Sequence, residues 1–188
     1  MNHALRKPMT LDGFLAWEDQ QEHKWEFDGF APVAMVGGTF EHAIIDGNIY
    51  AVLRDRLRGS PCRVVNNELK IRVAGRIRYP DAFVICTPVP RGTKVISEPV
   101  VVFEVLSEST RRTDQFLKNQ EYRDTPSIQH YVMLEQDRIA ATVWTRAGDD
   151  WVGRILLADA MLAMPEIGVE LPLAEFYDGV ELAPPEPP

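Results

Sequence analysis

The chain has 188 residues, of which 45% are hydrophobic and 26% charged, and its formal net charge is -8 at pH 7. These values are typical of a globular protein and exclude a fibrous or wholly disordered chain. The negative charge argues against a simple nucleic-acid-binding module, because phosphate binding depends on Lys and Arg. It does not exclude an enzyme that holds nucleic acid locally. We expect one domain over residues 1–180 and a disordered, proline-rich tail over residues 181–188.

No segment approaches the ~20 apolar residues of a membrane span, and the first residues lack the apolar run of a signal peptide. We therefore expect a cytoplasmic protein with no membrane partner. Disulfides are rare in that reducing compartment, so none is expected between Cys62 and Cys86. These two residues also lack the spacing of a zinc site.

The first third of the chain predicts two helices and a β-hairpin. Apolar spacing and a capping Thr10 predict a helix over residues 10–22. Alternating apolar residues on either side of an Asp-Gly turn predict a hairpin over residues 23–35. Thr39 caps a longer helix with one apolar stripe, which ends near Arg58.

The rest of the chain predicts mainly strands. They are expected over residues 62–73, 78–86, 100–106, 129–135, 138–145 and 151–157, with a loop over residues 87–99. A helix is expected between residue 107 and Pro126, and a closing strand and short helix before Tyr177. Because helices and strands do not alternate regularly, the sequence predicts a mixed α/β layer architecture and not a doubly wound one.

Glu104 is the most informative residue, because it interrupts the apolar run over residues 100–106. A carboxylate is costly to bury without a partner. Asp81 begins an apolar strand of its own, and a return through residues 87–99 would bring it beside Glu104. Two carboxylates on neighbouring strands suit Mg²⁺ or Mn²⁺. Such an ion serves phosphodiester hydrolysis by activating water and polarising a phosphoryl oxygen.

Lys118 is the candidate cation of this site. Asp114, Lys118 and Tyr122 follow one another at intervals of four residues, so they share one face of the predicted helix. Lys118 would then stabilise negative charge on a reacting phosphate. An ordinary surface pair between Asp114 and Lys118 explains the same spacing at least equally well.

Three further residues have both a functional and a structural interpretation. Glu26 lies between two aromatic residues and can either serve the site or point away from the core. His42 falls in the first turn of the second helix, where a structural role is more common than a catalytic one. Glu68 is either an outward-facing strand residue or a third carboxylate near the metal.

Several short motifs occur in a fixed order along the chain. They are Trp25-Glu26-Phe27-Asp28-Gly29, the stretch from Gly38 to His42, Tyr79-Pro80-Asp81, Phe103-Glu104-Val105-Leu106-Ser107 with Ser109-Thr110, and the helical set Asp114, Lys118 and Tyr122. Together they resemble the Uma-type family of restriction endonucleases, which belongs to the PD-(D/E)xK nuclease superfamily. The likeness covers nearly the whole chain, from about Thr10 to Tyr177.

The resemblance implies a restriction-endonuclease-like central mixed β-sheet flanked by helices. It implies metal ligation by Asp81 and Glu104, and supporting active-site positions for Glu26 and His42. The implied activity is cleavage of nucleic-acid phosphodiester bonds with a divalent metal.

The chain departs from the family pattern at two positions. The superfamily motif E-x-K would place a lysine where Leu106 stands, so Lys118 on the following helix is the natural substitute. Glu108 stands where the family more usually has proline, which alters a turn and leaves the ligands in place.

We therefore expect an endonuclease that depends on Mg²⁺ or Mn²⁺ and acts on nucleic acid, with DNA favoured as the partner. A homodimer would suit cleavage of both strands of a duplex. A second hypothesis is an inactive nuclease-fold domain that acts in nucleic-acid binding or protein interaction. In a third, Glu104 is simply paired with an Arg or Lys in the core.

Overall fold

The computed structural model describes residues 8–35, 37–107, 111 and 113–182. The proline-rich tail from Pro184 to Pro188, the Ser109-Thr110 pair and Glu108 lie outside the described residues, so the expectations about them are not addressed by the structure. Within the described part, no helix is both long enough and apolar enough to span a membrane.

A six-stranded sheet forms the centre of the molecule, with the strand order β11-β10-β9-β8-β6-β3. Its members are β3 (Arg63–Asn66), β6 (Ala82–Ile85), β8 (Val101–Leu106), β9 (His130–Glu135), β10 (Ala140–Ala147) and β11 (Asp150–Leu157). Neighbours β8 and β9 are parallel, and the other pairs are antiparallel. The predicted mixed sheet is therefore confirmed.

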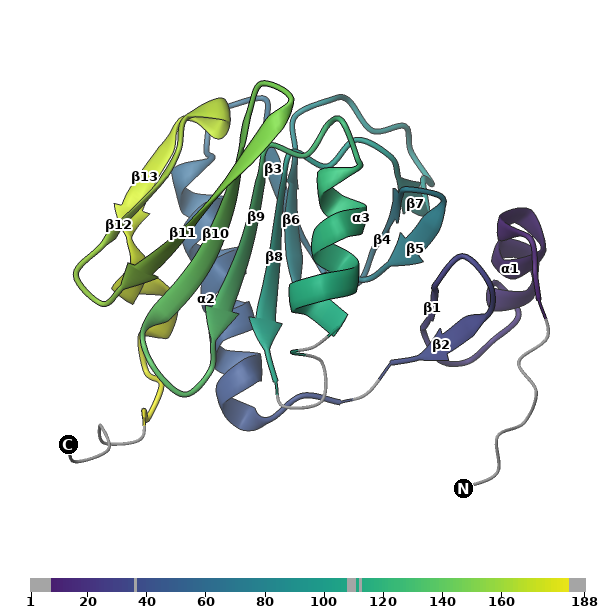
Figure 1. Ribbon diagram of the computed structural model, residues 1–188, viewed down its shortest axis with the longest axis horizontal. Coiled ribbons are helices and arrows are strands. Elements are labelled where there is room, and N and C mark those ends of the chain that lie inside the picture. The colour runs from purple at the N-terminus through teal and green to yellow at the C-terminus, as the bar shows by residue number, and fades with distance from the viewer. Residues whose placement is uncertain (1–7, 36, 108–110, 112, 183–188) are drawn as a thin grey trace.

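Helices cover both faces of this sheet (Figure 1). On one face, α2 (Phe40–Arg56) buries Ile45, Ile49 and Leu53 in a core that includes Phe103 of β8. On the other face lie η1 (Thr113–Lys118), a π-helix, and α3 (Asn119–Arg123), which buries Tyr122. Successive residues of a strand point to opposite faces, so Glu104, next to Phe103, belongs to the face of η1 and α3.

A smaller sheet with the order β2-β1-β5-β4-β7 lies beside the central one. Its strands are β1 (Trp25–Phe27), β2 (Pro32–Ala34), β4 (Lys70–Val73), β5 (Arg76–Arg78) and β7 (Val95–Ile96), and α1 (Leu11–Glu18) packs on β1. The predicted first helix, its Thr10 cap and the hairpin are confirmed. So is the Thr39 cap of α2, which ends close to the expected residue.

Two predicted strands are wrong in extent, because each is divided between the two sheets. The strand expected over residues 62–73 is interrupted by a turn between β3 and β4. The strand expected over residues 78–86 is interrupted between β5 and β6 by Pro80, which has no N–H to donate to a ladder. The predicted loop over residues 87–99 contains the short strand β7.

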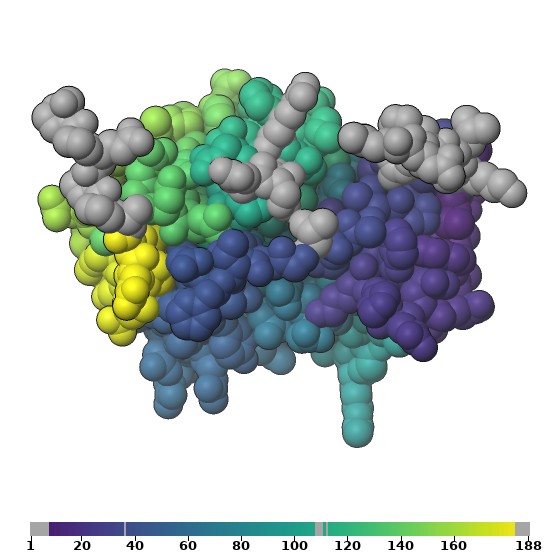
Figure 2. Space-filling model, turned by 90° about the horizontal axis from the view of Figure 1, so that it is seen from below, coloured from purple at the N-terminus to yellow at the C-terminus, as the bar shows by residue number. Residues whose placement is uncertain are grey.

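The chain closes with a hairpin where one strand was expected. Its elements are β12 (Met161–Met164), η2 (Pro165–Ile167), β13 (Val169–Pro172) and η3 (Leu173–Tyr177). The hairpin contributes Leu162 and Leu171 to the core beneath α2. Seen from below, the purple N-terminal elements and the yellow C-terminal segment lie at opposite ends of the molecule, with the blue α2 between them (Figure 2).

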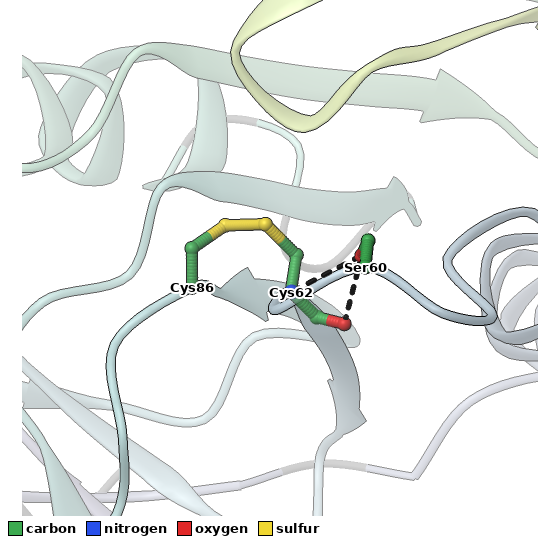
Figure 3. Close-up of a disulfide and its surroundings, with 3 residues drawn as sticks. All are labelled: Ser60, Cys62 and Cys86. Carbon is green, nitrogen blue, oxygen red and sulfur yellow. Dashed lines mark hydrogen bonds between the residues drawn. A yellow bond between two sulfur atoms is a disulfide. The ribbon is translucent and has the colours of Figure 1, made fainter.

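The expectation that Cys62 and Cys86 stay unpaired is wrong. Arg63 of β3 is the direct partner of Ile85 of β6, so the next residue outward on each strand is a cysteine. The two cysteines form a disulfide with a Cα–Cα distance of 3.9 Å (Figure 3). Sequence spacing could not show this contact, because it depends on the register between the two strands.

Candidate functional site

Asp81 and Glu104 meet at one edge of the β6–β8 pair. Ala82 is the direct partner of Phe103 in this antiparallel pair. Asp81, which precedes Ala82, and Glu104, which follows Phe103, therefore lie at the same end of the pair. The Asp81 Oδ2 atom accepts a hydrogen bond of 2.7 Å from the backbone N–H of Val105. This bond ties the start of β6 to the strand that carries Glu104.

Glu104 lies in the protein interior with only 4% of its surface exposed. Its Oε1 atom accepts two hydrogen bonds, from Lys118 Nζ at 2.9 Å and from the Tyr122 hydroxyl at 2.7 Å. Burial raises the pKa of Glu104 well above its usual value, although the Lys118 charge opposes that rise. A cation therefore stabilises the ionised form of this carboxylate.

Lys118 is equally buried and faces three carboxylates. Besides Glu104, its Nζ atom lies 3.0 Å from Asp114 Oδ1 and 3.6 Å from Glu26 Oε1. Burial lowers the pKa of Lys118, but the charges of Glu104, Glu26 and Asp114 outweigh that effect and raise it overall. The ammonium is therefore held in its charged form, and the interpretation of Lys118 as a surface residue is wrong.

Glu26 on β1 points inward and connects two cations. It contacts Lys118, and its Oε2 atom accepts a hydrogen bond of 3.0 Å from Arg78. Its Oε1 atom accepts another from the backbone N–H of Tyr79 at 3.1 Å. Arg78 in turn donates two bonds to Glu121 on α3, at 2.7 and 2.6 Å. The outward orientation considered for Glu26 is therefore wrong.

His42 approaches the site from the first turn of α2. Its Nε2 atom lies 3.4 Å from Asp81 Oδ2. Burial lowers the pKa of His42, but the contact with Asp81 and the nearby carboxylate charges outweigh it and raise the pKa. The backbone of Gly38 packs against the imidazole so closely that a Cβ there would lie 3.0 Å from the ring. A side chain at this position would therefore press on the ring and require it to shift slightly.

A cavity of about 470 Å³ gives access to these residues. One part of its wall carries the carboxylates Glu26, Asp46, Asp81, Glu104 and Asp114. Another part is apolar or bare backbone, formed by Val33, Ala34, Met35, Gly37 and Gly38. Of the described lining residues, only Lys118 is a lysine or arginine. The cavity lining therefore combines a set of acidic side chains with a set of apolar and bare-backbone residues.

Glu68, considered as a third carboxylate, does not reach this cavity. Its side chain is 72% exposed and pairs with Lys24 at 2.9 Å. It faces outward as considered, but from the turn between β3 and β4 and not from a strand.

Sequence reasoning missed Asp46 and the hydroxyl of Tyr122 as members of the site. Asp46 follows His42 by four residues, and this spacing on a capped helix was the available signal. Burial and the Asp81 charge raise the pKa of Asp46 to about 6. Its Oδ1 atom is buried and has no hydrogen-bond partner among the described residues.

Asp81 and Glu104 suit a hard divalent cation whose remaining ligands are waters or substrate phosphates. Among the described residues no group of three or more His, Cys, Asp and Glu side chains could hold a metal ion by itself. Mg²⁺ typically takes one or two protein carboxylates and completes its shell with waters and substrate phosphates. Within the same described residues, Asp81 Oδ1 and Glu104 Oε2 accept no hydrogen bond, so these oxygens are available for ligation.

Comparison with known proteins identifies the family. The model of the Uma2 family, described as "Putative restriction endonuclease", matches residues 11–174. The chain belongs to the Uma2 family. This confirms the resemblance seen in the motifs around Asp81 and Glu104.

Relatives of this Uma2 chain include two uncharacterized proteins of Synechocystis sp. Protein slr1290 is 30% identical over 176 residues, which cover 92% of this chain and 93% of the relative. Protein sll1609 is 24% identical over 152 residues, with coverage of 78% and 85%. A crystal structure titled as a putative nuclease belonging to DUF820, from Anabaena variabilis, superposes with a TM-score of 0.75 at 18% identity. The superposition covers 91% of this chain and 98% of the Anabaena variabilis chain, so the two proteins share a fold.

Proposed function

We propose that this Uma2 chain is a divalent-metal-dependent endonuclease that hydrolyses phosphodiester bonds of nucleic acid, with DNA as the favoured substrate. The observation that carries the proposal is the buried Glu104–Lys118 pair beside Asp81, at one edge of two neighbouring strands. Family membership supports it, because the family carries the description "Putative restriction endonuclease".

Asp81 and Glu104 would hold Mg²⁺ or Mn²⁺, and the ion, when bound, supplies polarisation of the phosphoryl oxygen and a more acidic water. The Asp81 carboxylate is positioned for this by Val105 N–H and by His42. The Glu104 carboxylate is positioned by Lys118 and Tyr122, both of which bond its Oε1 atom.

Lys118 has a second role in the proposal. Its ammonium stays protonated among three carboxylates and lies in the cavity wall. A fixed positive charge in a buried site stabilises the extra negative charge that develops on a phosphate during hydrolysis, without reorganisation of water. Glu26 also contacts this ammonium and joins it to Arg78.

A second candidate function is nucleic-acid or protein binding without catalysis. The observation that favours it, and favours protein binding in particular, is the charge of the cavity, whose described lining has five carboxylates and one lysine. Phosphate is repelled from such a surface unless cations neutralise it. The two functions differ in one respect that can be measured, which is turnover.

Cleavage assays on supercoiled plasmid and labelled single strands, with Mg²⁺, Mn²⁺ or chelator, test the proposal. Wild-type protein should cut one of these substrates only when metal is present, and Glu104→Gln should abolish the cutting. Glu68→Gln is the matched control, because Glu68 is exposed and lies outside the cavity. Its variant should cut like wild type.

Cutting that survives in Glu104→Gln would point to a contaminating nuclease and contradict the assignment. A wild type that cuts no substrate but binds nucleic acid would favour the second candidate function.

A further inference from the structure

The cavity that leads to Asp81 and Glu104 has the shape and lining of a site for a single nucleotide. Its volume of about 470 Å³ lies in the ~300–1,000 Å³ range of pockets that enclose a small molecule. Glu104 and Lys118, at its inner end, are 4% and 6% exposed. A phosphate must therefore enter the cavity to reach them.

An intact duplex is poorly suited to this site. Affinity for duplex DNA depends on several Lys and Arg contacts to phosphates. Of the described residues that line the cavity, only Lys118 is of this type, and it is already engaged by Glu104 and Asp114. Acidic side chains surround it. The described lining thus offers few cationic contacts to a phosphate backbone, so affinity at this cavity must come from contacts with bases, which an intact duplex keeps paired.

The apolar part of the lining offers what an unpaired base requires. Val33, Ala34 and Met35 present apolar side chains along the end of β2 and just beyond it. Next to them Gly37 leaves open space, since a Cβ built there would meet nothing within 4 Å. Apolar and bare-backbone surfaces of this kind accept the flat face of a base of any identity.

An exposed aromatic residue follows one of the lining residues in the sequence. Phe40 follows Thr39, which lines the cavity, and is 73% exposed. It opens α2, whose end is fixed by the cap from Thr39 and by the bond of that hydroxyl to Gln136 at 3.2 Å. A ring at a fixed helix end is a suitable platform for a neighbouring base, because stacking is the main attraction that single strands offer.

We propose that the substrate is a single or locally unpaired nucleic-acid strand. One nucleotide enters the cavity with its phosphate at Asp81 and Glu104 and its base against Val33 to Met35. The adjacent base stacks on Phe40. This inference rests on the proposed function for the position of the phosphate, and its test is a binding measurement that does not require turnover.

The test is fluorescence anisotropy of a short labelled oligonucleotide, with Ca²⁺ in place of Mg²⁺. The same sequence is offered as single-stranded DNA, as single-stranded RNA and as a DNA duplex. At least one single strand should bind about tenfold more tightly than the duplex, and Phe40→Ala should weaken that binding by about tenfold. The DNA and RNA arms show which backbone is preferred.

Phe116→Ala is the matched control. Phe116 is 68% exposed and lies on η1, but it is not part of the cavity wall. Both variants remove an exposed ring, so thermal unfolding should be unchanged in each. Phe116→Ala should bind the single strand like wild type.

Duplex binding equal to or tighter than single-strand binding overturns the inference, and so does an equal loss in the two Phe variants. A protein that cuts duplex DNA but does not prefer single strands keeps the proposed function and loses the inference. If the protein binds single strands through Phe40 but cuts no substrate, the inference is supported and the proposed nuclease function is contradicted.

Discussion

Lys118 on η1 holds its ammonium 2.9 Å from Oε1 of Glu104 on β8, with both side chains buried between helix and sheet. Removal of one partner of such a pair leaves an uncompensated buried charge, which costs about 3–5 kcal/mol. We predict that Lys118→Met lowers the free energy of unfolding by about 3 kcal/mol. Urea denaturation at neutral pH measures the difference.

The double variant Glu104→Gln/Lys118→Met is the control for this prediction. It removes the Glu104 charge together with the ammonium, so it should recover the part of the lost stability that comes from an unpaired Glu104, while Asp114 and Glu26 still lack the ammonium. A double variant as unstable as Lys118→Met alone would show that lost packing, and not charge, causes the effect.

Metal binding should stabilise the folded protein through Asp81. A ligand that binds only the folded state raises stability by about 2.7 kcal/mol at a hundredfold excess over its Kd. We predict that Mn²⁺ or Mg²⁺ raises the Tm of wild type, with a labelled strand present to supply phosphate ligands. Asp81→Asn should lose this rise. Glu68→Gln should keep it, and equal loss in both variants would contradict metal ligation by Asp81.

Asp46 should make stability depend on pH. Burial and the Asp81 charge raise its pKa from the usual 3.8 to about 6. Because the folded-state pKa is the higher one, the associated stability is present below about pH 4 and is lost as pH rises through 6. Asp46→Asn removes the charge, so we predict a gain of up to about 2 kcal/mol at pH 8, after allowance for partial exposure, and little change at pH 4.

Thermal or urea unfolding across this pH range, with a chelator present, measures the Asp46 effect. Asp55→Asn on the same helix is the control, because Asp55 is 68% exposed and pairs only with Arg58. Asp55→Asn should show no comparable pH-dependent gain. A gain of the same size at pH 4 and pH 8 in Asp46→Asn would contradict the ionisation of Asp46 as its cause.

The disulfide between Cys62 and Cys86 should contribute to stability by joining two strand ends. It closes a loop with a sequence separation of 24, for which chain entropy predicts about 3 kcal/mol. We predict that a reductant lowers the Tm of wild type, as Cys62→Ala/Cys86→Ala does without reductant. The double variant should not respond to reductant. A response in that variant equal to wild type would rule out the disulfide as the origin.

Local patterns were sufficient to predict most helices and strands and the proximity of Asp81 to Glu104. Glu104 stands out because it interrupts an apolar strand, and such a residue needs a partner wherever the strand lies. Thr10 and Thr39 identify the helix starts through hydrogen bonds made within a few residues. These features depend on short-range physics, so one sequence reveals them.

The errors concern contacts between distant segments. The local sequence left both an inward and an outward orientation open for Glu26, because nothing nearby in the sequence shows that Arg78 and Lys118 face it. Residues 78–86 are divided between two sheets because β5 pairs with β1 and β4, whereas β6 pairs with β8 and β3. Such contacts are fixed by tertiary packing, which local propensity does not determine.

Because β8 and β9 are parallel, the lysine that contacts the carboxylate on β8 can occupy different positions in the sequence. A chain that leaves β8 must travel back along the sheet before β9 can begin in the same direction. The segment containing η1 and α3 makes this return over the face that carries Glu104, and Lys118 on η1 reaches that carboxylate. Evolution can therefore exchange a lysine on the strand for one on the crossover while the ammonium stays at the carboxylate. In relatives whose strand lacks the lysine of the E-x-K motif, the three-dimensional position of the ammonium shows whether the site has kept its positive charge.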